Sequence, residues 1–120
     1  FVFGAATSSY QIEGSWNVSA AVVNDFDWWT HSCPEWIADD SNGDIACDSY
    51  RMYKEDVNLV KEIGFKFYRF SISWSRILPT GLTNDVSKDG VTYYNNLIRQ
   101  LHINGIETMV NTYHFDHPMK

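Results

Sequence analysis

The hydrophobic pattern of residues 65–79 predicts a buried strand at the centre of the fold. This segment, F-K-F-Y-R-F-S-I-S-W-S-R-I-L-P, is dense in aromatic and apolar residues and lacks glycine or proline before Pro79. The face of the strand that carries Arg69 begins apolar and then turns polar. Because a buried guanidinium needs an anion, we expect Arg69 to face either a carboxylate of the core or an anionic ligand. The apolar face is expected to pack on helices and presents Tyr68, Phe70, Ile72 and Trp74.

Two segments with a period of 3.6 residues predict amphipathic helices, one before and one after this strand in the sequence. The first helix is expected over residues 48–64, ending at a glycine, and the second over residues 91–104. Residues 1–10 and 106–114 are apolar enough to form a first and a third strand. The apolar positions of the first helix are Tyr50, Tyr53, Val57 and Val60.

The expected order is therefore strand, loop, helix, strand, helix, strand, which predicts an α/β fold. Right-handed crossovers give a parallel sheet in the order one, two, three, with both helices on one side. Polar residues 11–13, 69–73 and 114–117 then gather at the carboxyl ends of the strands, where such folds carry their chemistry. Residues 15–42 are expected to be a long irregular connection. Its four tryptophans either form a stacking surface for a ligand or pin the loop.

Composition narrows the classes of partner. The net charge is −6 with only nine lysines and arginines, which argues against nucleic acid. Neither a spanning apolar stretch nor a basic amphipathic run is present, so a membrane partner is not predicted. Aromatic residues make up 16% of the chain, more than a core of this size needs, which suggests an aromatic-lined cleft or a piece of a larger core.

Four kinds of chemistry are candidates for the polar clusters: metal binding, phosphate binding, serine nucleophile catalysis and carbohydrate binding. His114, Asp116 and His117 could ligate a metal, but no metal-binding motif accompanies them, and a metal is not predicted. No glycine-rich phosphate loop and no G-x-S-x-G serine motif is present. Gln11, His114 and Asp116, together with nearby tryptophans, suit a carbohydrate, which is bound by aromatic faces and hydrogen-bonding side chains.

Several motifs, in order along nearly the whole chain, resemble glycoside hydrolase family 1, the retaining β-glycosidases, and above all its β-glucosidase and myrosinase members. The matching segments are F-V-F-G-A-A-T-S-S-Y-Q-I-E-G-S-W-N at 1–17, N-G-D-I-A-C-D-S-Y at 42–50, Y-K-E-D-V at 53–57, F-Y-R-F-S-I-S-W-S-R-I-L-P at 67–79, Y-Y-N-N-L-I at 93–98 and T-Y-H-F-D-H-P at 112–118.

The resemblance implies a partial (β/α)8 TIM barrel, with strands 1–3 and helices 1–2, as one incomplete domain over residues 1–120. The parent enzyme would hydrolyse a β-glucoside or another small glycoside by double displacement, without a metal or cofactor. The family's acid/base glutamate in N-E-P and its nucleophile in E-N-G have no counterpart in this sequence. No catalytic residue is therefore assigned, and this chain alone is expected to be inactive. A non-catalytic or degenerate sugar-binding remnant and an independent small α/β domain are the alternatives.

The resemblance also assigns residues of a site. Gln11 and His114 match side chains that bind sugar hydroxyls, and Arg69 matches the arginine that lies against the nucleophile. Phe115 stands at a substrate-binding position where the family usually has tryptophan, and His117 stands where it usually has leucine. Asn17 begins a possible glycosylation sequon, Asn17-Val18-Ser19. An extracellular location is slightly favoured over a cytoplasmic one, and no disulfide between Cys33 and Cys47 is expected.

Overall fold

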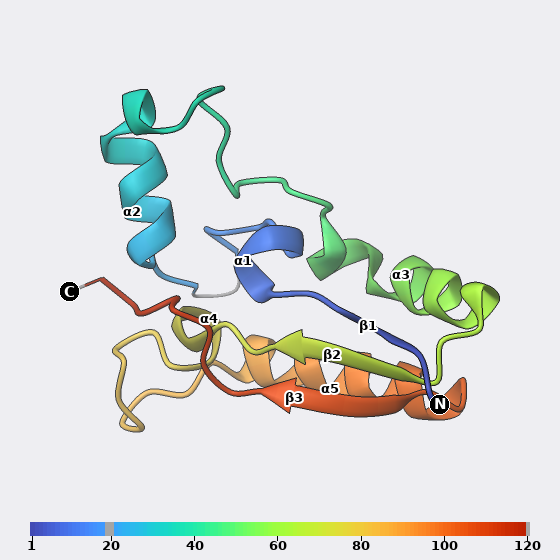
Figure 1. Ribbon diagram of the computed structural model, residues 1–120. Coiled ribbons are helices and arrows are strands. Elements are labelled where there is room, and N and C mark those ends of the chain that lie inside the picture. The colour runs from blue at the N-terminus through green and yellow to red at the C-terminus, as the bar shows by residue number, and fades with distance from the viewer. Residues whose placement is uncertain (19–20, 120) are drawn as a thin grey trace.

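The computed structural model describes residues 1–18 and 21–119 of the chain. The strands lie side by side in the lower part of Figure 1, with α1 near their carboxyl ends and α2 farther out. The elements in order are β1 (Gly4–Ala6), α1 (Ser9–Ile12), α2 (Asp25–Ser32), the 3₁₀ turn η1 (Pro34–Trp36), α3 (Ser49–Ile63), β2 (Phe67–Ser71), α4 (Trp74–Ile77), α5 (Lys88–Ile103) and β3 (Glu107–Asn111).

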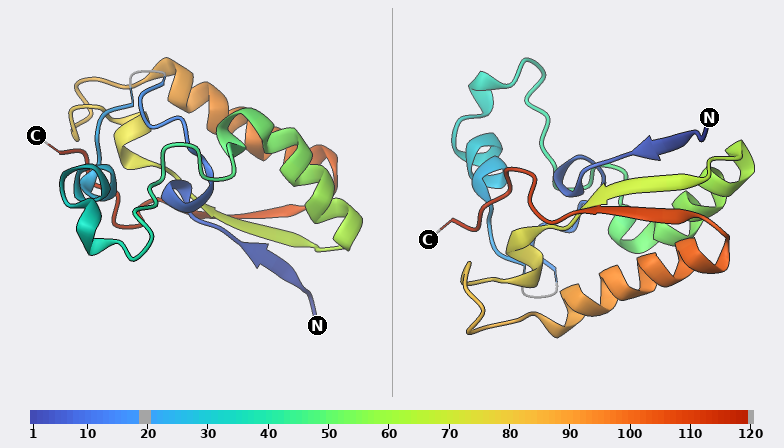
Figure 2. Two further views of the ribbon diagram at one scale, coloured as in Figure 1. Left: turned by 90° about the horizontal axis from the view of Figure 1, so that it is seen from above. Right: turned by 60° about the horizontal axis from the view of Figure 1, so that its bottom comes forward.

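Within the described residues, the strands form one parallel sheet in the order β1-β2-β3. Arg69 of β2 is the register partner of Ala6 in β1 and of Met109 in β3. Figure 2 (left) shows α3 and α5 together on one side of this sheet. The predicted strand order, parallel direction and placement of both helices are thus confirmed.

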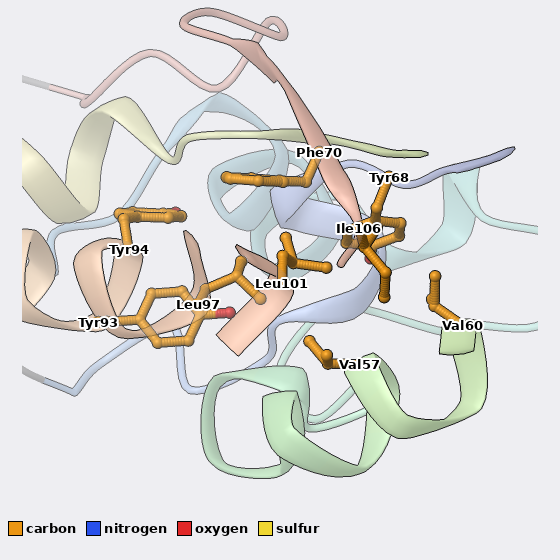
Figure 3. Close-up of a cluster of buried hydrophobic side chains, with 9 residues drawn as sticks. All are labelled: Val57, Val60, Tyr68, Phe70, Tyr93, Tyr94, Leu97, Leu101 and Ile106. Carbon is orange, nitrogen blue, oxygen red and sulfur yellow. The ribbon is translucent and has the colours of Figure 1, made fainter. Parts of the chain in front are cut away.

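The hydrophobic core lies between the sheet and these two helices (Figure 3). Tyr68 and Phe70 project from β2 toward the helices and are 5% and 2% exposed, as the alternation of the strand predicts. Leu101 of α5 is completely buried at the centre. The remaining members of this cluster are Val57, Val60, Tyr93, Tyr94, Leu97 and Ile106.

The two long helices begin and end at residues with a clear local reason. α3 ends at Gly64, whose φ of 89° is left-handed and whose N–H bonds back to the carbonyls of Val60 and Lys61. α5 begins at Lys88, three residues before the predicted start, because the hydroxyl of Ser87 accepts a hydrogen bond from the N–H of Gly90. The capping serine, rather than the first apolar residue, sets this boundary.

The predicted strand over residues 65–79 is too long. β2 ends at Ser71, and residues 74–77 form the short helix α4. This bend takes Ile72 and Trp74 out of the strand and buries the side chain of Arg76, which is 3% exposed. Arg76 finds polar partners there that an extended chain packed between helices would not offer.

The first strand and the long connection also differ from the prediction. β1 covers only Gly4–Ala6, and the polar residues after it form α1. The connection contains α2 and η1, because Asn24 and Asp27 form a reciprocal capping box at the start of α2. Trp29 packs against Trp28 and Trp36 at centroid distances of 5.5 and 4.8 Å, and all three rings are exposed, so the two roles predicted for the tryptophans stay open.

One face and both edges of the sheet are open in the described part of the chain. Phe67 and Arg69, on the face opposite the helices, are half-buried, and Met109 beside Arg69 is 59% exposed. β1 and β3 each pair with β2 only. Open edges beside apolar side chains favour pairing with other chains.

We therefore expect the 120-residue chain to self-associate as its concentration rises, since β1 and β3 offer unpaired backbone groups. Sedimentation velocity between about 2 and 200 μM would measure the association. A proline replacing Val110 in edge strand β3 should reduce this self-association. A proline in β2 is not a suitable probe, because β2 is the central strand and a proline there would disrupt the sheet itself. A single monomeric species over the whole range would contradict the expectation.

Candidate glycoside site

A chain of buried hydrogen bonds ties the three strand ends together. The backbone N–H of Ser9, after β1, donates to Oγ of Ser71 at the end of β2 (2.7 Å). The hydroxyl of Ser71 donates to Oγ of Ser9 (3.1 Å), and the hydroxyl of Ser9 donates to Oδ2 of Asp116 after β3 (2.8 Å). All three residues are at most 3% exposed. We call this set, Ser9, Ser71 and Asp116, the strand-end clamp.

Asp116 is the acceptor at the end of the clamp. Its second oxygen, Oδ1, accepts from the backbone N–H of His114 (3.4 Å). Burial raises the pKa of Asp116, and the hydrogen bond from Ser9 opposes that rise. The clamp therefore holds the loop that carries His114 against the start of α1, which carries Gln11. The structure thus brings these two predicted site residues to the same end of the sheet.

Gln11 is exposed on α1, and its side chain is held by Ser8. The hydroxyl of Ser8 donates to Oε1 of Gln11 at 2.7 Å, and Ser8 itself is 3% exposed. Gln11 also lines a groove of about 300 Å³ between α1 and the loop that follows η1. Its side chain is therefore accessible to a ligand and partly ordered in advance.

Arg69 and Phe115 complete the predicted site residues at these strand ends. Arg69 is half-buried, and its Nη1 donates to the backbone carbonyl of Thr7 (3.2 Å). Among residues 1–18 and 21–119 it has no acidic partner, so the expected carboxylate in the core is not found. Phe115 is 65% exposed with a left-handed φ of 67°, and its ring lies 5.7 Å from those of Tyr113 and His114.

The buried ion pair belongs to a different arginine, which the sequence did not single out. Nε of Arg76 donates to Oε2 of Glu13 at 3.0 Å, and both side chains are about 5% exposed or less. The hydroxyl of Tyr94 donates to the other oxygen, Oε1, at 2.6 Å. Burial raises the pKa of Glu13, while the charge of Arg76 and the hydrogen bond from Tyr94 oppose that rise.

The remaining guanidinium nitrogens of Arg76 are also occupied. Nη2 donates to the carbonyls of Gly14 and Ser15 (3.0 and 3.3 Å), and the carbon centre lies 4.3 Å from the ring centroid of Tyr50. A sequence signal did exist, because Ser73 before W-S-R-I and Pro79 after it are typical of a short helix. It was hidden within the long apolar run.

The other predicted residues are placed as follows. Nδ1 of His117 lies 3.3 Å from Oδ2 of Asp25 and 3.1 Å from the hydroxyl of Tyr113, so His117 fastens this loop to α2. In the described residues no group of three potential ligands converges on a metal position. Cys33 and Cys47 are free thiols. Asn17 is exposed, but Ser19 of its sequon lies outside the described residues.

Comparison with known proteins identifies the fold to which this arrangement belongs. The sequence profile described as Glycosyl hydrolase family 1 matches residues 1–120, the whole chain. This chain belongs to glycosyl hydrolase family 1. No helix in the described part of this family 1 chain has the length and apolar character needed to cross a membrane.

Curated relatives and solved structures agree with the family. Myrosinase 1 of Brevicoryne brassicae is 53% identical over 98% of this chain, and the furostanol glycoside 26-O-β-glucosidase of Hellenia speciosa is 54% identical over the same share. The chain spans only 25% and 21% of their lengths. It superposes on aphid myrosinase with a TM-score of 0.96, covering 98% of this chain and 26% of that one.

A second solved structure is a complex with a ligand. The virulence factor SghA, described in complex with its substrate analog salicin, is 38% identical with a TM-score of 0.94. The match covers 99% of this chain and 26% of the SghA chain. The family 1 chain therefore has the conformation of the corresponding part of complete TIM-barrel enzymes, and the predicted partial barrel is confirmed.

Proposed function

We propose that residues 1–120 are the opening part of a single family 1 barrel domain and supply part of the sugar-binding site of a β-glucosidase-type hydrolase. The observation that carries the proposal is the strand-end clamp. It joins the loop of His114 to the helix of Gln11 through the 2.8 Å bond between Ser9 and Asp116. A β-glucoside or another small glycoside is the proposed substrate, because the exposed amide of Gln11 and the half-buried imidazole of His114 suit sugar hydroxyls.

The acids nearest to this site are engaged in structural roles. Retaining hydrolysis needs two carboxylates about 5–5.5 Å apart, one as acid/base and one as nucleophile. Glu13 is held by Arg76 and Tyr94, and Asp116 by Ser9, with exposures of 4% and 1%. Neither can reach a substrate. Arg69, whose described contact is a backbone carbonyl, is available to a carboxylate supplied by the rest of a barrel.

We expect the purified 120-residue chain to release no nitrophenol from p-nitrophenyl β-glucoside, because both carboxylates at the proposed site, Glu13 and Asp116, are buried. A Glu13→Gln/Asp116→Asn double variant is the control. Turnover by the chain that this double change abolishes would place the chemistry in these residues and contradict the proposal.

Complementation tests the sugar-binding role directly. Residues 1–120 would replace the matching segment of the 54% identical β-glucosidase from Hellenia speciosa. The resulting chimera is expected to hydrolyse the nitrophenyl glucoside. Gln11→Ala should lower its kcat/KM roughly 5- to 150-fold, the equivalent of one or two hydrogen bonds to the sugar at about 1–3 kcal/mol in total.

Gln100→Ala is the matched control for this change. Gln100 lies in the last turns of α5, which precede β3 and therefore sit at the opposite end of the sheet from Gln11. Its replacement should leave kcat/KM within about twofold. Equal losses from the two changes would show that Gln11 has no special role.

A degenerate, non-catalytic relative is the second candidate. Two observations favour it: the phenyl ring of Phe115 lacks the indole donor expected there, and His117 is committed to Asp25 and Tyr113. A chimera that folds and retains glucose binding but shows no turnover would support this candidate. An extracellular location remains a prediction of the sequence alone.

A further inference from the structure

At the start of α1, Ser8 and Ser71 form hydrogen bonds that differ from those of an ordinary helix N-terminus. Ser8 is the N-cap residue of α1, yet its side chain accepts no hydrogen bond from the helix backbone. A serine at this position ordinarily accepts from an N–H of the first turn. Instead, Ser71 of β2 accepts from the N–H of Ser9 (2.7 Å). The N–H of Gln11, which such a side chain could take, donates instead to the backbone carbonyl of Ser8 (3.1 Å). The hydroxyl of Ser8 therefore bonds to a partner outside the helix backbone.

That partner is the amide of Gln11. The hydroxyl of Ser8 donates to Oε1 of Gln11 at 2.7 Å, from a position that is 3% exposed and extended (φ −131°, ψ 151°). A long, exposed glutamine side chain otherwise samples many rotamers, and ordering it on binding has an entropic cost. In this arrangement the amide oxygen of Gln11 faces Ser8 and its amino group faces away.

We propose that Ser8 is a positioning residue for the sugar site, which orients the side-chain amide of Gln11 before substrate arrives. The amino group of Gln11 is thereby presented as the hydrogen-bond donor, with one lone pair of Oε1 remaining as acceptor. This inference rests on the proposed function, since it assigns Gln11 the role of contacting the sugar. It adds the residue that decides how Gln11 makes that contact.

A double-mutant cycle in the chimera tests whether Ser8 acts through Gln11. Ser8→Ala should lower kcat/KM on the nitrophenyl glucoside roughly 5- to 30-fold, with the thermal midpoint changed by less than about 2 °C. In the Gln11→Ala background the same change should have almost no further effect. Ser8→Thr keeps the hydroxyl and should restore most of the activity.

Ser87→Ala is the matched control, because Ser87 caps α5 with its side chain whereas Ser8 does not cap α1. It should lower the thermal midpoint and leave kcat/KM nearly unchanged. Equal losses from Ser8→Ala with and without Gln11 would overturn the inference. If Gln11→Ala has no effect in the chimera, the proposed function fails instead.

A second readout does not depend on activity. In the 15N-labelled 120-residue chain, at a concentration below its self-association, the side-chain amide of Gln11 should show a positive heteronuclear NOE typical of an ordered group. Ser8→Ala should reduce that NOE to the value of a mobile side chain, while the NOE of Gln100 stays constant. An equally mobile Gln11 amide in both chains would overturn the proposal even where the chimera is inactive.

Discussion

Replacing Arg76 by methionine is expected to remove a large part of the folding stability of this chain. The change leaves the Glu13 carboxylate buried at 4% exposure without its cation, and it leaves the carbonyls of Gly14 and Ser15 without donors. Removing one partner of a buried ion pair typically destabilises by about 3–5 kcal/mol. A domain of this size has a total stability of about 5–15 kcal/mol. Urea denaturation followed by tryptophan fluorescence at low protein concentration would measure the loss.

Arg69→Met is the matched control for that variant. Arg69 lies in the same part of the sequence and is half-buried, but its described side-chain contact is one backbone carbonyl at 3.2 Å. We expect a loss of about 1 kcal/mol or less. Adding Glu13→Gln to Arg76→Met should recover part of the stability, because the uncompensated charge is then removed. Equal losses from the two arginine changes would contradict the assignment of the core ion pair to Arg76.

Replacing Asp116 by alanine is expected to destabilise the chain by about 1–3 kcal/mol at neutral pH. The change leaves the buried hydroxyl of Ser9 and the N–H of His114 without their acceptor. It would also release the loop of His114 from α1. Asp116→Asn should have a smaller effect, because it keeps an acceptor and resembles the protonated acid.

The pH dependence of this pair of variants follows from the direction of one pKa shift. Burial raises the pKa of Asp116 above its ordinary value of 3.8, so the folded state favours the protonated acid. That contribution is fully present below the unfolded pKa and is lost as the pH rises through the higher folded pKa. The stability of the native chain relative to Asp116→Asn should therefore fall as the pH rises from about 4. Denaturation curves between pH 4 and 8 measure this difference, and a rise with pH would contradict it.

The sequence by itself determined the order of the sheet and the two helices that cover it. Tyr68 and Phe70 alternate in a strand, while Val57 and Val60 repeat at helical spacing, and both periods report directly which face is buried. It also placed Gln11, Arg69 and His114 at the strand ends, because parallel strands end at one edge. The family motifs followed from the same local residues, and the match over residues 1–120 confirmed them.

Only the tertiary structure decided which polar residues are partners. Arg69 and Arg76 look alike in the sequence, but the bend after Ser71 buries Arg76 beside Glu13, 63 residues away, and leaves Arg69 with a backbone contact. The bond between Ser9 and Asp116 joins residues 107 positions apart. Hydrophobic periodicity is a local property of the chain, whereas an ion pair or a hydrogen bond depends on where two distant segments meet. The roles of Glu13, Ser71 and Asp116 could therefore be assigned only once the sheet had brought its strand ends together.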